Sequence, residues 1–152
     1  MSRVLIFLTL LACTPGTYGT FSELSAERPV EPSCIRTGLE STPGVSSVEA
    51  LARTSHGRTL SWTPIETRST LFVFAFDGTE QSLHLLNEDT GGRSAGARLS
   101  ASVVGSWEGE DRCPTPAAAA AFDRMAEAVL PRIADACFGG RMPTFETSKR
   151  CL

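Results

Sequence analysis

The cysteines are the residues of this sequence whose type and spacing constrain chemistry most. They are Cys13, Cys34, Cys113, Cys137 and Cys151. No pair has the Cys-x-x-Cys spacing of a thioredoxin-like redox centre or a zinc knuckle. The nearest pair, Cys137 and Cys151, is farther apart than the ligands of a local metal motif. We therefore expect structural disulfides and no bound metal.

The last four cysteines form an even set, which predicts two disulfides in an oxidising compartment. Four cysteines allow three pairings, and the sequence leaves all three open. We favour Cys34 with Cys137 and Cys113 with Cys151, because the second bond would tie the entry of a C-terminal helix to the tail. A bridge that closes a loop of about 100 residues contributes about 4 to 5 kcal/mol in the chain-entropy model.

Histidine is the next residue type that could act in catalysis, as a general base, and the chain has His56 and His84. A base needs a nucleophile within reach, and no Gly-x-Ser-x-Gly elbow or Ser-x-x-Lys pair occurs. A triad assembled in space remains open. His84 lies between Leu83 and Leu85 in a predicted strand, so we expect it at the sheet surface. We assign no catalytic residue.

Two further motifs resemble cofactor sites only in part. The outer glycines of 91–96 have the spacing of a phosphate-binding loop, but Ala97 and Arg98 stand where lysine and a hydroxyl residue are required. Asn87 could begin a calcium loop, yet its bidentate glutamate would fall at Arg98. The acidic cluster 108–111 is typical of a solvated turn. We expect no cofactor.

Length and charge limit the classes of protein that remain. The chain of 152 residues is long enough for one domain, and 41% hydrophobic residues are enough for a packed core. The net charge of −3 and the scattered basic residues disfavour nucleic acid as a partner.

The N-terminus has the pattern of an export signal. Arg3 precedes an apolar stretch from Val4 to Ala12, which is shorter than the about 20 residues of a transmembrane helix. The stretch ends in Leu10-Leu11-Ala12-Cys13, which resembles the lipobox of bacterial lipoproteins, although Leu11 is larger than the residue usual there. This resemblance covers only the leader; the folded region resembles no family known to us.

The resemblance implies a signal peptide over residues 1–12 and a mature chain that begins at Cys13. In that family the cysteine carries a diacylglycerol and acyl chains such as palmitate, and several chains hold a protein firmly on a membrane. Thr14 follows the cysteine, where an aspartate would imply the inner membrane, so the outer membrane, facing the periplasm, is implied. The alternative is an ordinary signal cleaved after Gly19, which would leave a soluble periplasmic or secreted protein.

The organisation after the leader follows from composition and periodicity. Residues 13–32 are rich in Thr, Pro, Ser and Glu, which predicts a flexible tether. Residues 33–152 then form one disulfide-stabilised α+β domain. Ser33 could cap a short helix that brings Ile35 and Leu39 onto one face, and 43–44 would end it.

Extended segments follow. We expect strands near 48–53, 58–63, 70–76, 81–86 and 97–107. A turn at 55–57 would join the first two, Asp77-Gly78 would form a type I′ hairpin turn, and 87–96 would be a polar loop. The segment 70–76 is apolar on both faces, which favours a central strand. The aromatic residues Trp62, Trp107, Phe72, Phe74 and Phe76 are expected in the core first and in a ligand groove second.

A long amphipathic helix closes the domain. Thr115-Pro116 predicts its start, Pro131 should kink it, and Gly139-Gly140 should end it. Its apolar side needs a partner surface, and the sheet provides one. We therefore predict an α+β fold: an antiparallel β-meander of about four to five strands, with a short N-terminal helix and a long C-terminal helix packed on one face.

Three functions are compatible with these features. The leader, the tether and the missing catalytic set favour a lipid-anchored cell-envelope protein that acts as a small interaction or structural accessory module. Its partners would be the membrane, through the anchor, and an envelope protein, with the uncovered face of the sheet as the contact surface. The alternatives are a small periplasmic hydrolase with dispersed catalytic residues and an inhibitor or immunity-type protein that masks a basic target.

Overall fold

The computed structural model describes residues 17–24, 29–58, 64–89, 95–104, 115–142 and 146–150. Its elements in chain order are β1 (Thr17–Leu24), α1 (Pro32–Glu40), β2 (Val45–Arg58), β3 (Pro64–Phe76), β4 (Thr79–Asp89), β5 (Ala95–Val104), α2 (Pro116–Phe138) and β6 (Glu146–Arg150). The leader, Cys13, Cys113, Cys151, Trp62, Trp107 and the acidic cluster 108–111 lie outside the described residues, so the predictions made for them stay predictions.

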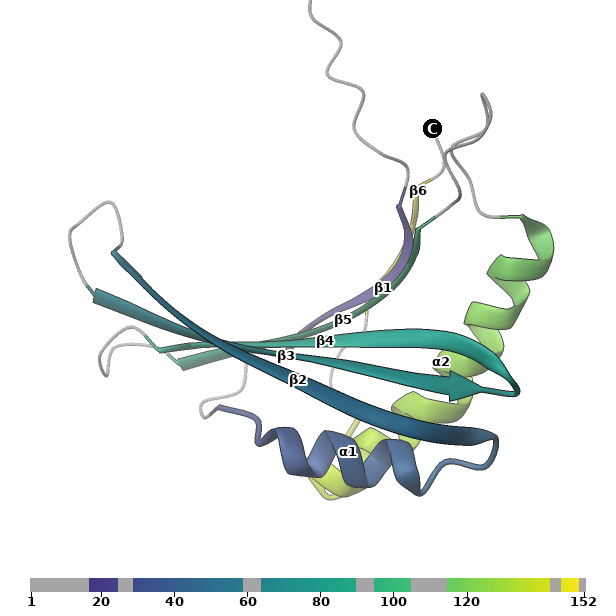
Figure 1. The fold of residues 1–152 in the computed structure, drawn as a ribbon, viewed down its shortest axis with the longest axis horizontal. Coiled ribbons are helices and arrows are strands. Elements are labelled where there is room, and N and C mark those ends of the chain that lie inside the picture. The colour runs from purple at the N-terminus through teal and green to yellow at the C-terminus, as the bar shows by residue number, and fades with distance from the viewer. Residues whose placement is uncertain are drawn as a thin grey trace, which may run out of the picture.

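All these strands belong to one antiparallel sheet with the order β2-β3-β4-β5-β1-β6. The strands β2 to β5 are consecutive in sequence and adjacent in space, which confirms the predicted meander. Helices α1 and α2 lie on the same side of the sheet (Figure 1). The α+β class with a short and a long helix on one face is therefore confirmed, and β1 and β6 extend the sheet beyond β5.

The core lies between the helices and one face of the meander. Alternate residues of β3 and β4 point into it, because successive side chains of a strand lie on opposite faces. Phe72, Phe74, Leu83 and Leu85 are almost wholly buried there. From the helices, the core receives these buried side chains: Ile35, Leu39, Phe122, Met125, Val129 and Ile133. The predicted helix-on-sheet packing is thus the source of the core.

The two helices are joined by packing and by a disulfide. Gly38 of α1 lies so close to α2 that a Cβ atom there would stand 2.8 Å from the Ile133 Cα. Cys34 and Cys137 form a disulfide with a Cα–Cα distance of 5.2 Å, across a sequence separation of 103 residues. The favoured partner of Cys34 is confirmed, and the disulfide ties the first helix to the last.

The cap predicted at Ser33 is wrong: Ser33 lies inside α1, whose N-cap is Glu31, because Pro32 can occupy the first turn of a helix.

Other turn and cap signals agree with the structure. Asp77 and Gly78 both have positive φ, 47° and 78°, as a type I′ turn between β3 and β4 requires. Thr115 caps α2, and its hydroxyl accepts a hydrogen bond from the Ala118 N–H at 3.2 Å. Gly139 takes the left-handed conformation at the other end. These signals act over a few residues, which is why they are readable from sequence.

The turn predicted at 55–57 is wrong. Strand β2 continues to Arg58, with His56 opposite Glu66 and Gly57 opposite Ile65 on β3. We also expected a separate strand at 58–63. Its first residue, Arg58, is instead the last residue of β2, and residues 59–63 lie outside the described residues. The reason is that β3 begins at Pro64 and supplies a partner along the whole length of β2, so pairing overrides the local turn propensity of His-Gly.

The tether predicted for 13–32 is wrong for part of its length. Strand β1 occupies Thr17–Leu24 and pairs with both β5 and β6. Val30 is also buried in the core, so the domain begins before residue 33. The composition of the segment did not indicate that it forms a strand. Its backbone N–H and C=O groups are paired with two strands that lie far away in the sequence, whatever its side chains are. The polar loop expected at 87–96 is shorter too, since β4 extends to Asp89 and β5 begins at Ala95.

Candidate functional site

The face of the sheet turned away from the helices is the first candidate, and we call it the open face. It comprises the outward residues of β2 to β5, and it is defined by a row of cross-strand neighbours: Leu51 lies opposite Leu71, Leu71 opposite His84, and His84 opposite Ser100. Leu51 is 60% exposed and Leu71 is 37% exposed. Adjacent exposed leucines on one face are the kind of apolar surface that marks a protein contact.

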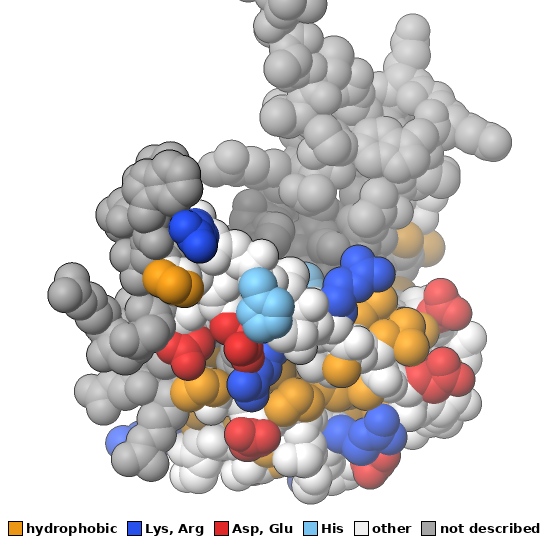
Figure 2. Space-filling view, turned by 60° about the vertical axis from the view of Figure 1, so that its left-hand side comes forward, with side chains coloured by type: hydrophobic (Ala, Val, Ile, Leu, Met, Phe, Trp, Pro, Cys, Tyr) orange, Lys and Arg blue, Asp and Glu red, His pale blue; other side chains and the backbone are white. Residues whose placement is uncertain are grey.

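Half-buried apolar residues and charges surround these leucines. Val73 lies on the open face one row away from Leu71, and Leu86 lies one row away on the other side. The strand β2 adds exposed Glu49 and Arg53, one on each side of Leu51. At the left-hand end of Figure 1, which Figure 2 brings forward, the molecule likewise shows hydrophobic side chains with acidic, basic and histidine side chains between them. An apolar centre with a polar margin is the usual anatomy of a protein interface.

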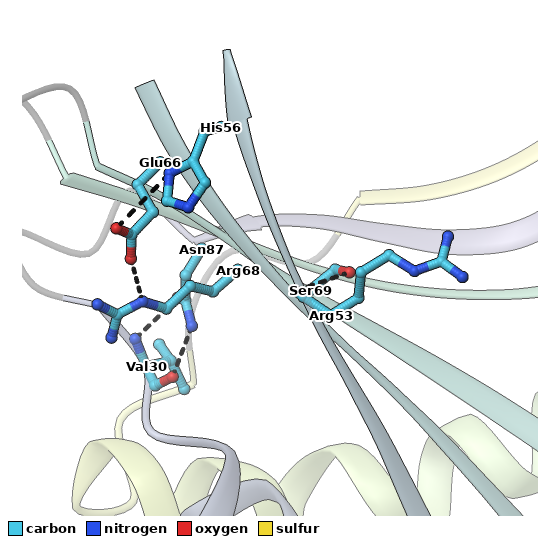
Figure 3. Close-up of polar contacts among 7 residues, drawn as sticks. All are labelled: Val30, Arg53, His56, Glu66, Arg68, Ser69 and Asn87. Carbon is cyan, nitrogen blue, oxygen red and sulfur yellow. Dashed lines mark hydrogen bonds and ion pairs between the residues drawn. The ribbon is translucent and has the colours of Figure 1, made fainter. Parts of the chain in front are cut away.

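The second candidate lies on the helix side, where the far ends of β2, β3 and β4 extend past α1 (Figure 1). The core ends there at Asn87. Its side chain accepts a hydrogen bond from the Val30 N–H at 3.0 Å and donates one to the Val30 carbonyl at 2.9 Å (Figure 3). Both bonds are buried, and they join β4 to the segment before α1. Asn87 therefore holds the chain as a neighbouring strand would.

Beyond Asn87, the same face carries an ionic group. Arg68 donates a hydrogen bond through Nε to the Glu66 carboxylate, and His56 Nδ1 lies 4.0 Å from the other Glu66 oxygen (Figure 3). The hydrogen bond to Glu66 raises the pKa of the Arg68 guanidinium. Arg68 is 72% exposed, and such pairs contribute little to stability.

The ionic group does not orient His56 as a general base requires. The side chain of His56 is 75% exposed, and its distance to Glu66 exceeds that of a hydrogen bond. Glu66 also accepts a hydrogen bond from Arg68 through its other carboxylate oxygen. His84 is exposed on the open face, as the sequence predicted, whereas His56 lies on the helix side. The two histidines are thus placed on opposite faces of the sheet.

Neither region has the features of a metal site or a membrane span. Among the described residues, no group of three or more His, Cys, Asp or Glu side chains is arranged to hold a metal ion. Within the same residues, no helix has both the length and the apolar character to cross a bilayer. Likewise, every buried side-chain nitrogen or oxygen in the described part of the chain has a hydrogen-bond partner.

Sequence reasoning located the open face but missed most of the residues that matter on it. Leu51 lies in a predicted strand, and alternation alone could have paired it with Glu49 and Arg53 on one face. The neighbour relation between Leu51 and Leu71, and the bonds between Asn87 and Val30, depend on register between distant segments. No signal in the sequence indicates that register.

Comparisons with known proteins add no relative: no family model, no curated protein and no solved structure matches this chain.

Proposed function

We propose that this chain is an exported protein, attached through lipid on Cys13 to the periplasmic side of the outer membrane. Its α+β domain acts as a small interaction or structural accessory module for another envelope protein. The anchor rests on the lipobox-like sequence Leu10-Leu11-Ala12-Cys13 at the end of an apolar stretch. The disulfide between Cys34 and Cys137 is in keeping with an oxidising compartment such as the periplasm.

The observation that carries the interaction role is the pair of neighbouring exposed leucines on the open face. Leu51 and Leu71 are cross-strand partners, and each presents a large apolar side chain to solvent. Burying such side chains against a partner yields about 25 cal/mol for each Å² removed from water. The surrounding charges of both signs favour a protein surface with its own polar margin over a lipid surface.

The anchor is tested by the intact mass of the protein extracted from membranes without reductant, before and after thiol alkylation. We expect a chain that begins at Cys13, carries acyl chains and has no alkylatable thiol. The variant Cys13→Ser should lose the acyl mass and leave the membrane fraction. An unacylated chain cut near Gly19 would replace the anchor with the soluble alternative.

The contact surface is tested with a photo-crosslinking amino acid placed at Leu71 in the full chain, in cells that produce it. We expect adducts with an envelope protein that also co-purifies with the unaltered chain. Leu71→Glu should abolish this co-purification, because it places a charge at the centre of the apolar contact. The matched control is Met142→Glu, since Met142 is 54% exposed but lies beyond the end of α2. Equal loss with both variants would argue against the open face.

A further inference from the structure

Strand β2 forms one edge of the sheet, and its outer side carries no strand in the part of the chain that the structure describes. At the β-bulge between Ser46 and Glu49, the Val48 carbonyl accepts a hydrogen bond of 3.4 Å from Arg36. From Glu49 to Gly57 the strand is regular, and nearly all of its residues are exposed. An edge of this length presents backbone N–H and C=O groups that can pair with another strand.

We propose that β2 pairs antiparallel with β2 of a second copy of this chain, about a two-fold axis that lies midway between the two copies of Leu51. The two sheets then form one continuous sheet, and the same surface serves on both subunits, as in most symmetric dimers. This inference does not rest on the lipid anchor or on an envelope partner, because it is argued from the edge strand β2 and its neighbour Leu71 on β3.

Charge complementarity selects this partner and this register. With Leu51 opposite Leu51 of the partner subunit, Glu49 of each chain lies opposite Arg53 of the other. Two ion pairs then flank the axis on the open face, and opposite charges directly across an antiparallel pair are favourable. Pairing a strand with itself in this way requires opposite charges at equal distances from the axis, and Glu49 and Arg53 meet that condition.

The same register accounts for the exposed leucines. Leu71 of β3 lies next to Leu51 of β2. In the proposed dimer, these two leucines and the same two of the partner subunit would therefore form one row of four. Neighbouring strands are about 4.8 Å apart, which brings these side chains into contact along the row. Leu51, the more exposed of the two leucines in one chain, would be at the centre of the joined face.

The alternative hypothesis is that Glu49 and Arg53 only prevent the edge of β2 from pairing with other strands, as charges on many edge strands do. The two hypotheses differ in what a charge reversal does. If the charges only repel other strands, reversing one of them should not create or abolish a specific dimer. If they pair across a two-fold axis, the reversals at 49 and 53 must depend on each other.

The decisive experiment uses full-length unaltered chain, Glu49→Arg, Arg53→Glu and the double variant, measured by sedimentation and native mass spectrometry. Concentrations should reach about 100 µM, because one strand pair buries less area than a standard interface. We expect a dimer for the unaltered chain and dissociation constants about tenfold or more higher for each single variant. Within one strand the two positions are about 13 Å apart, so they cannot compensate for each other inside one chain.

Compensation between chains is the specific signature. An equimolar mixture of Glu49→Arg and Arg53→Glu should form a heterodimer, because both cross-strand pairs are then of opposite charge. The double variant should dimerise with itself as the unaltered chain does. Rescue in the mixture also shows that both single variants are folded. A monomeric unaltered chain, or single variants that dimerise like it, would overturn the proposal.

The position of the axis has its own test. Leu51→Cys should give a disulfide-linked dimer on a non-reducing gel, since only the residue beside the two-fold axis lies opposite its own copy. Glu49→Cys and Arg53→Cys should each fail alone and should link when mixed. Equal linking of Glu49→Cys and Arg53→Cys to themselves would contradict the register.

Discussion

Phe72 and Leu71 are consecutive residues of β3, yet one is wholly buried and the other is 37% exposed. The difference comes from the helices, which cover one face of the sheet, whereas no described helix or strand covers the other. The apolar run 70–76 predicts a strand buried on both sides, and β3 does lie between two other strands. Its outward residues Val73 and Ala75 are nevertheless only half-buried. An apolar run therefore indicates residues that favour burial, and on the open face the described part of one chain buries them only in part.

Truncating the side chains of Phe72 and Leu71, one at a time, tests the difference between the covered face and the open face most directly. Phe72→Ala should lower the free energy of unfolding by about 3 to 5 kcal/mol, because it leaves a cavity in the core. Leu71→Ala should change it by less than about 0.5 kcal/mol, because its side chain is already partly in water. Urea unfolding of both variants measures the contrast. Similar losses in the two variants would mean that the open face is part of the core.

The disulfide between Cys34 and Cys137 joins the two helices that cover one face of the sheet, so its removal should destabilise this helical layer. The double variant Cys34→Ser/Cys137→Ser should lose about 4 kcal/mol, because the unfolded chain regains the freedom of a long loop. Denaturation of the variant and of the unaltered oxidised chain gives the difference. Reductant should weaken the unaltered chain in the same direction, and an unchanged midpoint in the variant would contradict the expectation.

Asn87 marks the end of the covered face, where the core gives way to the exposed ionic group. Asn87→Ala should lower the free energy of unfolding by about 2 kcal/mol, because the buried N–H and C=O of Val30 lose their partner. Hydrogen exchange of the Val30 amide should accelerate. Arg68→Ala is the control, with a change below about 1 kcal/mol for an exposed ion pair. A slow Val30 amide in the Asn87 variant would show that another group holds this segment.

The fit between the helices is tested at Gly38. Gly38→Ala should cost about 1 to 2 kcal/mol, because its Cβ would meet the Ile133 backbone at 2.8 Å, and backbone cannot rotate away. Alanine favours the helix by nearly 1 kcal/mol over glycine, which offsets part of the clash. Thr37→Ala, at an exposed position of the same helix, is the matched control. A more stable Gly38 variant would mean that α1 can move away from α2.

Much of the fold was readable because its signals are local. The Asp77-Gly78 turn, the Thr115 cap and the Gly139 end of α2 each depend on residues a few positions apart. The placement of β1, the continuation of β2 through His56 and the partner of Asn87 were not readable, because they depend on segments far apart in sequence. Of the candidate site, alternation indicates that Leu51 points outward, but its neighbours follow only from the strand register.

The sequence by itself determined the α+β class, an antiparallel meander of about four to five strands and both helices, since side-chain periodicity and turn chemistry act within single elements. That the meander has four strands was decided by the structure. It also favoured the bond between Cys34 and Cys137. Only the tertiary structure decided which face the helices cover, how far β2 extends and which residues stand across from one another. Backbone hydrogen bonds join strands with little regard to side chains, so the partner of a segment is chosen by the whole fold.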